Sequence, residues 1–298
     1  MRGNLSSNSH PLVTIGIPAF NSEKTISAAI ESVLQQDYEN FELLVSDNYS
    51  TDATLDICES YSRSDPRVTV IAQSENIGAV NNFNFLLKRA NGTYFCWLGS
   101  DDKLAPEHLR LSVELLRSES DLIGCQAQAI FDFEVALGIE STAFRFSSSQ
   151  CHRIKQFFQN PGRSHGLFYG LYKIEKLRNY RLQSFEFFAW DWCLILNLLA
   201  QGKIGSTGRL GLISGSTGVS SSNLVYQHYG ISGVKRLLPY SMFTKVAWSD
   251  VHVWSKGARV YLLYWLIRIN IRYLLLERHE VKHWIKTRIS SLLTGGKK

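Results

Sequence analysis

Two adjacent aspartates are the residues in this sequence best suited to metal chemistry. Asp101 and Asp102 come shortly after the apolar run TYFCWL, which ends at Leu98. Mg²⁺ and Mn²⁺ prefer oxygen ligands and often take one or two carboxylates together with substrate phosphates. A cation held there could neutralise a departing diphosphate. The same pair could instead cap the helix that Pro106 opens or form a solvated turn, and the residues alone leave these interpretations open.

Two other strand-like runs end in residues that could contact a nucleotide. Asp47 follows the run FELLVS and could accept a hydrogen bond from an N–H of a base. The polar stretch Ser50–Asp52 behind it suits the capping of a helix better than chemistry. Phe20, within the stretch Pro18–Asn21, could pack on a flat base. An ordinary core position is the alternative, and on this residue alone it is favoured.

The elements that position these side chains alternate in type. Strand-like apolar runs are followed each time by a helical face, which predicts a mostly parallel sheet with helices on both of its faces. In such sheets ligands bind outside the carboxyl ends of the strands, which is where all three stretches lie. The expected strands are 12–18, 41–46, 68–72 and 93–98, and the expected helical faces are 26–34, 55–61, 80–90 and 109–116.

The middle of the chain is less regular. We expect a loop over 141–150 and a helix over 187–199. Gly, Ser and Thr dominate residues 205–222, so this segment should be mobile or turn tightly. No repeat and no low-complexity linker precedes Gly230, which makes a clean domain boundary before that residue doubtful.

In this order and spacing, the stretches resemble the family 2 glycosyltransferases of the GT-A fold. The resemblance is strong over residues 11–116 and weaker to about residue 204. It implies a Rossmann-like α/β fold in which 11–116 bind the nucleotide sugar and 117–229 bind the acceptor. It also implies inverting transfer of a sugar from a UDP- or dTDP-sugar to a saccharide or lipid-linked acceptor, in cell-envelope polysaccharide or glycolipid assembly. The matching segments are TIGIPAFN, SVLQQDYENFELLVSDNYSTDAT, SENIG and ANGTYFCWLGSDDKLAPEHL.

The resemblance implies roles for individual residues. Asp47 would read uracil or thymine, and Asp101 would match the metal-binding position of the DxD signature, with Asp102 beside it. The cofactor would be Mg²⁺ or Mn²⁺. Two positions depart from the family pattern, because Gly99 or Ser100 replaces the first acidic residue and Asn48 replaces the second aspartate of the DDGSTD-like stretch. The implied donor-binding residues are Pro18, Ala19, Phe20, Asn21, Asp47, Asn76, Gly78, Ser100 and Asp101.

The general base of an inverting member is an Asp on the acceptor side, near the start of a helix. Asp191, between Trp190 and Trp192, is our prediction for this base. Aromatic neighbours should raise its pKa and make it a better base. Glu186 is the competing candidate. Asp191 could also simply cap or salt-bridge its helix.

Three other classes of protein are weighed against a glycosyltransferase. A nucleotidyltransferase would be expected to carry a basic, glycine-rich loop after the first strand, and a dinucleotide oxidoreductase would carry GxGxxG there. Neither motif is present. A non-catalytic nucleotide-sugar-binding protein or membrane scaffold stays open, because Gly99 and Asn48 reduce the number of carboxylates.

Charge divides the chain into two parts. Residues 230–298 contain 13 Lys or Arg against 3 Asp or Glu, whereas residues 1–229 carry a net −4. The apolar run 260–276 is shorter than the roughly 20 residues of a spanning helix, and it contains Arg268 and Arg272. We therefore expect 230–298 to form a basic amphipathic helical tail on an anionic membrane surface. The alternative is a helix packed on the catalytic domain or on another subunit.

The remaining composition bears on where the protein works. The first residues include no apolar stretch of signal-peptide length, and the five cysteines are dispersed, as is usual for reduced thiols. We expect a cytoplasmic protein, peripheral on the inner face of the plasma membrane. No motif supports nucleic acid as a partner.

Overall fold

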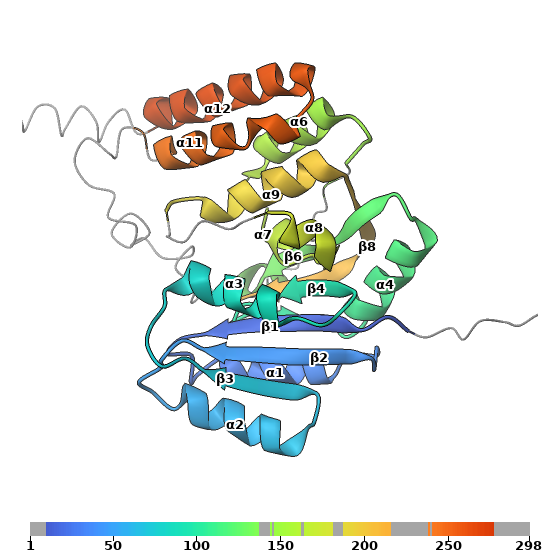
Figure 1. Cartoon of the computed structure of the whole chain (residues 1–298), viewed down its shortest axis with the longest axis vertical. Helices are drawn as coiled ribbons and strands as arrows, with labels where there is room; N and C mark the ends of the chain where they lie inside the picture. The colour runs from blue at the N-terminus through green and yellow to red at the C-terminus, as the bar shows by residue number, and fades with distance from the viewer. Residues whose placement is uncertain are drawn as a thin grey trace, which may run out of the picture.

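The computed structural model describes residues 10–136, 144, 146–161, 164–180, 187–215, 238 and 240–276 (Figure 1). Its described strands form an eight-stranded sheet with the order β3-β2-β1-β4-β7-β6-β8-β5. The strands are β1 Val13–Ala19, β2 Phe41–Asp47, β3 Val68–Ala72, β4 Tyr94–Trp97, β5 Lys103–Leu104, β6 Leu122–Phe131, β7 Leu171–Lys173 and β8 Lys203–Ser214.

The first part of the sheet has the predicted parallel arrangement. Strands β3, β2, β1 and β4 run parallel to one another, and β6 runs parallel to β8. Strand β7 is antiparallel to both β4 and β6, and β5 is antiparallel to β8. The prediction of a mostly parallel α/β sheet is confirmed. The antiparallel pairs were not indicated by the sequence pattern.

Helices cover both faces of the sheet because both faces are apolar. Successive side chains of a strand point to opposite faces. In β4, Cys96 joins the cluster beneath α1, α2 and α4, whereas Phe95 and Trp97 join the cluster beneath α3 and α9. The helices of the first half are α1 Ile26–Leu34, α2 Thr54–Ser64, α3 Ala79–Arg89 and α4 His108–Ser118, and all four lie where helical periodicity predicts them.

The second half adds a helical layer above α3 and α9 (Figure 1). Helix α9 confirms the helix predicted over 187–199. Helices α11 and α12 belong to the predicted C-terminal extension, but its predicted boundary at 229/230 lies outside the described residues. The helices are α5 Asp132–Ala136, α6 Gln150–Gln159, α7 His165–Phe168, α8 Ile174–Arg178, α9 Trp190–Gln201, α11 Ser241–Ser249, the 3₁₀ turn η4 Val251–Val253 and α12 Lys256–Leu276.

One face of α12 packs on the rest of the chain. Ala258, Leu262 and Leu266 are buried, and the ring of Trp265 stacks on Phe158 of α6 with the centroids 5.7 Å apart. This packing corresponds to the alternative in which the helix rests on the catalytic domain. None of the helices in the described ranges is both long enough and apolar enough to cross a bilayer.

The expectation of a turning segment over 205–222 is wrong for its described part. Residues up to Ser214 belong to β8, which pairs with β6 over most of its length. The pairing has register shifts, and Gly208 has a φ of +69°. The Gly, Ser and Thr content of this segment is consistent with its register shifts and with the positive φ of Gly208. It did not predict that the segment forms a strand. Long-range pairing with β6 supplies the hydrogen bonds that overcome the weak propensity of Gly and Ser.

Candidate functional site

A cavity of about 820 Å³ lies outside the carboxyl ends of β1 and β4. It also reaches the N-terminus of α9 and the end of β8, so residues far apart in the chain meet there. Asp47 is the one predicted site residue that does not line the cavity. The others line it together: Pro18, Ala19, Phe20, Asn21, Asn76, Gly78, Ser100, Asp101, Asp102 and Asp191.

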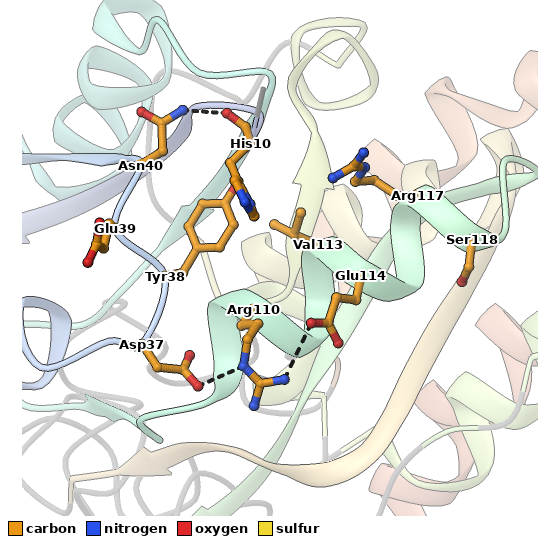
Figure 2. Close-up of a pocket in the computed structure, with 10 residues that line it drawn as sticks. All are labelled: His10, Asp37, Tyr38, Glu39, Asn40, Arg110, Val113, Glu114, Arg117 and Ser118. Atoms are coloured by element: carbon orange, nitrogen blue, oxygen red, sulfur yellow. Dashed lines mark hydrogen bonds and ion pairs between the residues drawn. The ribbon is translucent and has the colours of Figure 1, made fainter. Parts of the chain in front are cut away.

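A second cavity, of about 700 Å³, lies at the opposite edge of the parallel strands. Figure 2 shows His10 and Asn40, which precede β1 and β2, facing helix α4. Its central cation, Arg110, already pairs with Asp37 at 2.7 Å and with Glu114 at 3.4 Å. None of the predicted site residues lines this cavity. We therefore place the functional site at the carboxyl edge.

Asn21 joins the loops that follow β1 and β2. Its φ of 49° lies in the left-handed region, which Asn adopts more readily than most residues. Its Oδ1 accepts a hydrogen bond from the backbone N–H of Thr51 at 2.9 Å, and its own N–H donates to Ser50 Oγ at 2.9 Å. Neighbouring Phe20 is 46% exposed. The interpretation of Phe20 as a core aromatic is therefore wrong, and its ring is accessible from the cavity.

Asp47 ends β2 beneath the rim of the cavity. It is buried, and its Oδ2 accepts the backbone N–H of Ser50 at 3.0 Å. Its Oδ1 is buried without a hydrogen-bond partner among the described residues. Buried polar atoms are usually paired, so an unpaired carboxylate oxygen needs an explanation. A base N–H is one donor that would satisfy it, and base recognition by Asp47 stays a prediction.

Asn48 explains one departure from the family pattern. Its Oδ1 accepts the N–H of Ile77 at 2.9 Å, and its Nδ2 donates to Asn76 Oδ1 at 3.0 Å. That same oxygen of Asn76 accepts the N–H of Gly78 at 2.9 Å, which fixes it as an acceptor. An aspartate at position 48 could not donate to it. Asn48 thus holds the loop 76–78 at the entrance of α3.

Asp52 makes the contact at the helix start that was predicted for the polar stretch after β2, although the N-cap residue itself, Ala53, makes no side-chain cap hydrogen bond. The Oδ1 of Asp52 accepts the N–H of Thr54, the first residue of α2, at 3.0 Å, and its Oδ2 accepts the N–H of Glu23 at 3.1 Å. The carboxylate therefore satisfies a donor at a helix start and joins the loops after β1 and β2. It lies in the wall of the cavity as well.

Asp101 and Asp102 lie on a tight turn between β4 and β5. Helix α4 starts at His108 and its N-cap residue, Glu107, makes no side-chain cap hydrogen bond, so the interpretation of the pair as a helix cap is wrong. Asp102 is buried, and its Oδ1 accepts the N–H of Gly215 at 2.9 Å. Burial raises the pKa of Asp102 to about 7, with a further contribution from the charge of Asp101.

Two glycines make room for this turn. A Cβ on Gly99 would lie 2.6 Å from Asp102 Oδ2, which explains why this chain has glycine here in place of the family's acidic residue. A Cβ on Gly215 would lie 2.3 Å from the backbone oxygen of Asp101. The end of β8 is therefore pressed against the aspartate turn. Glycine at both positions allows the close approach.

The described residues include no ready-made metal centre. No group of three or more His, Cys, Asp or Glu side chains gathers there in a metal-binding arrangement. Two adjacent carboxylates nevertheless fit a cation that takes its remaining ligands from substrate phosphates and water. By the resemblance, Asp101 is the principal ligand of the two. A metal contact by either residue stays a prediction.

Asp191 lies in the first turn of α9 and lines the same cavity as Asp101. Burial raises its pKa to about 6, although the backbone N–H groups of Asp191 and Trp192 favour the carboxylate. The predicted direction of the shift is confirmed. The residue before the helix, Ala189, has a φ of 64°, an uncommon backbone conformation that turns the chain into α9 at this point. Glu186 lies outside the described residues.

Two aromatic side chains that the sequence did not single out line the cavity that these acids share. Phe83 of α3 and Phe168 of α7 contribute to the wall together with Trp190. His165 lies nearby with its ring edge-on to Phe131 at 5.2 Å. Phe83 was read only as part of a helical face, because periodicity does not distinguish core residues from those that face a cavity.

The sequence profile of glycosyl transferase family 2 matches residues 14–177, more than half of the chain. The chain belongs to glycosyl transferase family 2. The match begins in β1 and ends in α8, so it includes Asp47 and Asp101 but not Asp191. Family membership therefore supports the predicted donor-binding residues more directly than it supports Asp191 as the general base.

Two curated relatives match a little more than a third of this family 2 chain. TuaG of Bacillus subtilis (strain 168), whose name links it to teichuronic acid biosynthesis, is 36% identical over 113 residues, which are 38% of this chain and 45% of TuaG. WfgD of Escherichia coli is 38% identical over 105 residues, 35% of this chain and 41% of WfgD. It is named a UDP-Glc:alpha-D-GlcNAc-diphosphoundecaprenol beta-1,3-glucosyltransferase. The chain spans less than half the length of these relatives.

Solved structures extend the likeness to the second half. S. aureus TarS 1-349 in complex with UDP-GlcNAc aligns with a TM-score of 0.63 at 17% identity, covering 85% of this chain and 71% of that one. At this identity the likeness shows the fold alone. The GT-A fold expected from the sequence is therefore confirmed for this family 2 chain.

The hydrogen bonds of Asn48 yield a stability prediction. Asn48→Asp should lower the free energy of unfolding by about 1–3 kcal/mol, because a carboxylate would face the fixed acceptor of Asn76. Urea unfolding of the ligand-free protein measures this. Asn160→Asp, at an exposed position, is the control and should stay within about 0.5 kcal/mol of the parent. An unchanged urea midpoint for Asn48→Asp would contradict the assigned hydrogen bonds.

Proposed function

We propose that this protein is an inverting glycosyltransferase that moves a sugar from a nucleotide-diphosphate sugar to an acceptor hydroxyl. The observation that carries the proposal is the meeting of Asp101 and Asp191 in one cavity. Asp101 lies on the turn after β4, at the edge of the sheet where we place the donor. Asp191 lies in the first turn of α9, on the side where we place the acceptor. Family membership supports the reaction class.

The charge of the cavity supports a divalent cation as cofactor. Among the described residues that line it, the acids are Glu23, Asp52, Asp101, Asp102 and Asp191. A diphosphate entering such a cavity meets like charge, and like charges held close together repel strongly in a partly buried site. We assign Mg²⁺ or Mn²⁺ to Asp101, with Asp102 beside it. The bound cation offsets the negative charge of the leaving diphosphate.

A neighbour in fold supports the choice of cation. The mannosyltransferase PcManGT of Pyrobaculum calidifontis was solved with GDP-Man and Mn²⁺, and it aligns with this chain at a TM-score of 0.59 and 16% identity. In this protein Asp102 also positions the turn, because its Oδ1 holds the N–H of Gly215. Asp101 is the principal ligand, because it matches the metal-binding position of the family signature, and Asp102 is the supporting one.

Asp191 acts as the general base. Its carboxylate accepts the proton of the acceptor hydroxyl while the acceptor oxygen attacks the anomeric carbon. The nucleoside diphosphate departs from the opposite face of the sugar, so a single displacement inverts the configuration. No covalent intermediate on the protein is needed. A pKa of about 6 leaves Asp191 ionised at neutral pH and still basic enough to take a proton.

The donor is a UDP- or dTDP-sugar, and the acceptor is a saccharide or a lipid-linked saccharide of the cell envelope. Asp47, with its unpaired buried Oδ1, supports recognition of a base N–H. Pro18, Ala19, Phe20 and Asn21 form the stretch along which the nucleotide lies. The name of WfgD, a relative acting with UDP-Glc on a lipid diphosphate, supports the acceptor class.

A non-catalytic nucleotide-sugar-binding protein or membrane scaffold is the alternative. Its motivation was the loss of two family carboxylates at Gly99 and Asn48. Both departures have a structural reason here, because Gly99 makes room for Asp102 and Asn48 hydrogen-bonds Asn76. Neither departure removes Asp101 or Asp191. A nucleotidyltransferase would also use metal-bound phosphates, and the family match supports glycosyl transfer over that reaction.

The base assignment predicts both a variant effect and a pH profile. Asp191→Asn should lower kcat by about 10²-fold or more, since a positioned base contributes 10²–10⁴. The kcat of the parent should rise with pH up to about 6 and level off above it, because only the deprotonated carboxyl accepts the proton. Release of nucleoside diphosphate from UDP-sugars with a saccharide acceptor measures both.

Asp56→Asn, at an exposed position in the first turn of α2, is the control and should leave kcat unchanged. Near-parental turnover of Asp191→Asn would refute the base. Donor binding by the parent protein, without any turnover on a panel of acceptors, would favour the non-catalytic alternative.

We further propose that α12 places the protein peripherally on the cytoplasmic face of an anionic plasma membrane. The face of α12 turned away from α6 carries exposed apolar residues, with Val260 at 73% and Ile267 and Ile271 at 50% exposure. Arg268 lies on the same exposed side and donates a hydrogen bond to Tyr264 Oη at 2.7 Å. An apolar strip with adjoining cations is typical of helices that lie in a membrane surface.

The membrane proposal predicts binding to vesicles that contain phosphatidylglycerol. Replacing Ile267 and Ile271 by Asp should weaken sedimentation with such vesicles at least about tenfold, because the burial of two side chains in lipid is lost. Val135→Asp, at an exposed apolar position of α5, is the control. Equal binding of the double variant and its parent, or no binding by either, would contradict the proposal.

A further inference from the structure

We propose that the transferred sugar is an uncharged one, and that the wall formed by Phe83, Phe168 and Trp190 selects it over a uronic acid. We call these three residues the aromatic wall. The inference rests on the proposed function, which places a donor sugar in this cavity. It goes further by naming the class of sugar.

The aromatic wall is a packed unit. The ring centroids lie 5.5 Å apart for Phe83 and Phe168, 5.6 Å for Phe83 and Trp190, and 5.5 Å for Phe168 and Trp190. Behind them Trp97 is fully buried, stacks on Phe168 at 5.4 Å, and donates its indole N–H to the backbone oxygen of Phe83 at 3.0 Å. Edge-to-face contacts of this kind hold the rings in place.

The position of the wall assigns it to the sugar. Asp101, the proposed ligand of the cation that would bind the departing diphosphate, and Asp191, the proposed base, line the same cavity as the three rings. The transferred sugar must lie between these two acids. Trp190 directly precedes Asp191, so one ring of the wall adjoins the reacting end of the site. The sugar therefore contacts rings as well as carboxylates.

A uronic acid would carry its own carboxylate into these surroundings. Asp191 would repel it, and the cation proposed at Asp101 and Asp102 would serve the diphosphate. The faces of aromatic rings are negative and attract cations, not anions. A carboxylate that loses water without gaining a partner is strongly disfavoured. A neutral hexose carries a hydroxymethyl group in place of that carboxylate, so it has no charge to be repelled or desolvated.

Two described residues of the lining could offer positive charge. Lys24 is exposed and lies beside the stretch Pro18–Asn21, on the nucleotide side of the cavity. His165 packs edge-on against Phe131 of β6. Neither belongs to the aromatic wall.

Matched donors test the inference on the parent protein. With Mn²⁺ present, competition against labelled UDP gives the affinities of UDP, UDP-glucose, UDP-glucuronate, UDP-galactose and UDP-galacturonate. Within each sugar pair, the neutral donor should bind at least about tenfold more tightly than the uronate. Equal or tighter binding of the uronates would overturn the inference and leave the proposed function intact. Failure of all five ligands to bind, UDP included, would contradict the proposed function itself.

Charge variants test the cause of the selection. Phe83→Arg places a cation in the wall and should narrow the ratio of UDP-glucose to UDP-glucuronate affinities about tenfold. Phe85→Arg, on the same helix but not lining the cavity, should leave the ratio unchanged. Asp191→Asn, which removes one repelling charge, should narrow the ratio as well, and it serves if Phe83→Arg fails to fold. An unchanged ratio in the folded variants would overturn the assigned cause.

Discussion

Carboxylates gathered at the carboxyl edge of the sheet must accommodate a ligand that is itself anionic. A divalent cation between the carboxylates and the ligand would remove this repulsion. We propose Asp101 as the residue that binds the cation. The strands that end at this edge bring the residues proposed to bind the nucleotide, the diphosphate and the sugar into one cavity. Asp191 lines the same cavity from the first turn of α9, a helix of the second half of the chain.

The local departures from the family pattern follow from the packing of this particular turn. Asp102 is buried and bound to Gly215, which leaves no room for a side chain at position 99. Asn48 must donate a hydrogen bond to Asn76, which a carboxylate cannot do. These exchanges remove charge from the rim of the cavity but keep the two acids on which the proposed chemistry depends. The absence of acidic residues at positions 99 and 48 is therefore not evidence that this chain has lost the activity.

Much of the donor half was predictable because its signals are local. Each strand from β1 to β4 is a short apolar run, each following helix shows helical periodicity, and the ends of parallel strands must lie at one edge of the sheet. The same logic placed Asp101 beside Asn21. Strand β8 escaped prediction because its Gly-rich sequence depends on pairing with β6, about 80 residues earlier in the chain. Phe83 and Phe168 escaped as well, because they come from separate helices and meet Trp190, on a third helix, only in the folded chain.

Calorimetric titration of UDP with and without Mn²⁺ tests the central claim most directly. For the parent protein, Mn²⁺ should tighten UDP binding at least about tenfold, because the cation offsets the repulsion between the diphosphate and the acids of the cavity. In Asp101→Ala this gain should disappear, while the thermal stability of the ligand-free protein remains close to that of the parent. Equal affinity with and without Mn²⁺ in the parent, or a full Mn²⁺ effect in Asp101→Ala, would contradict the account.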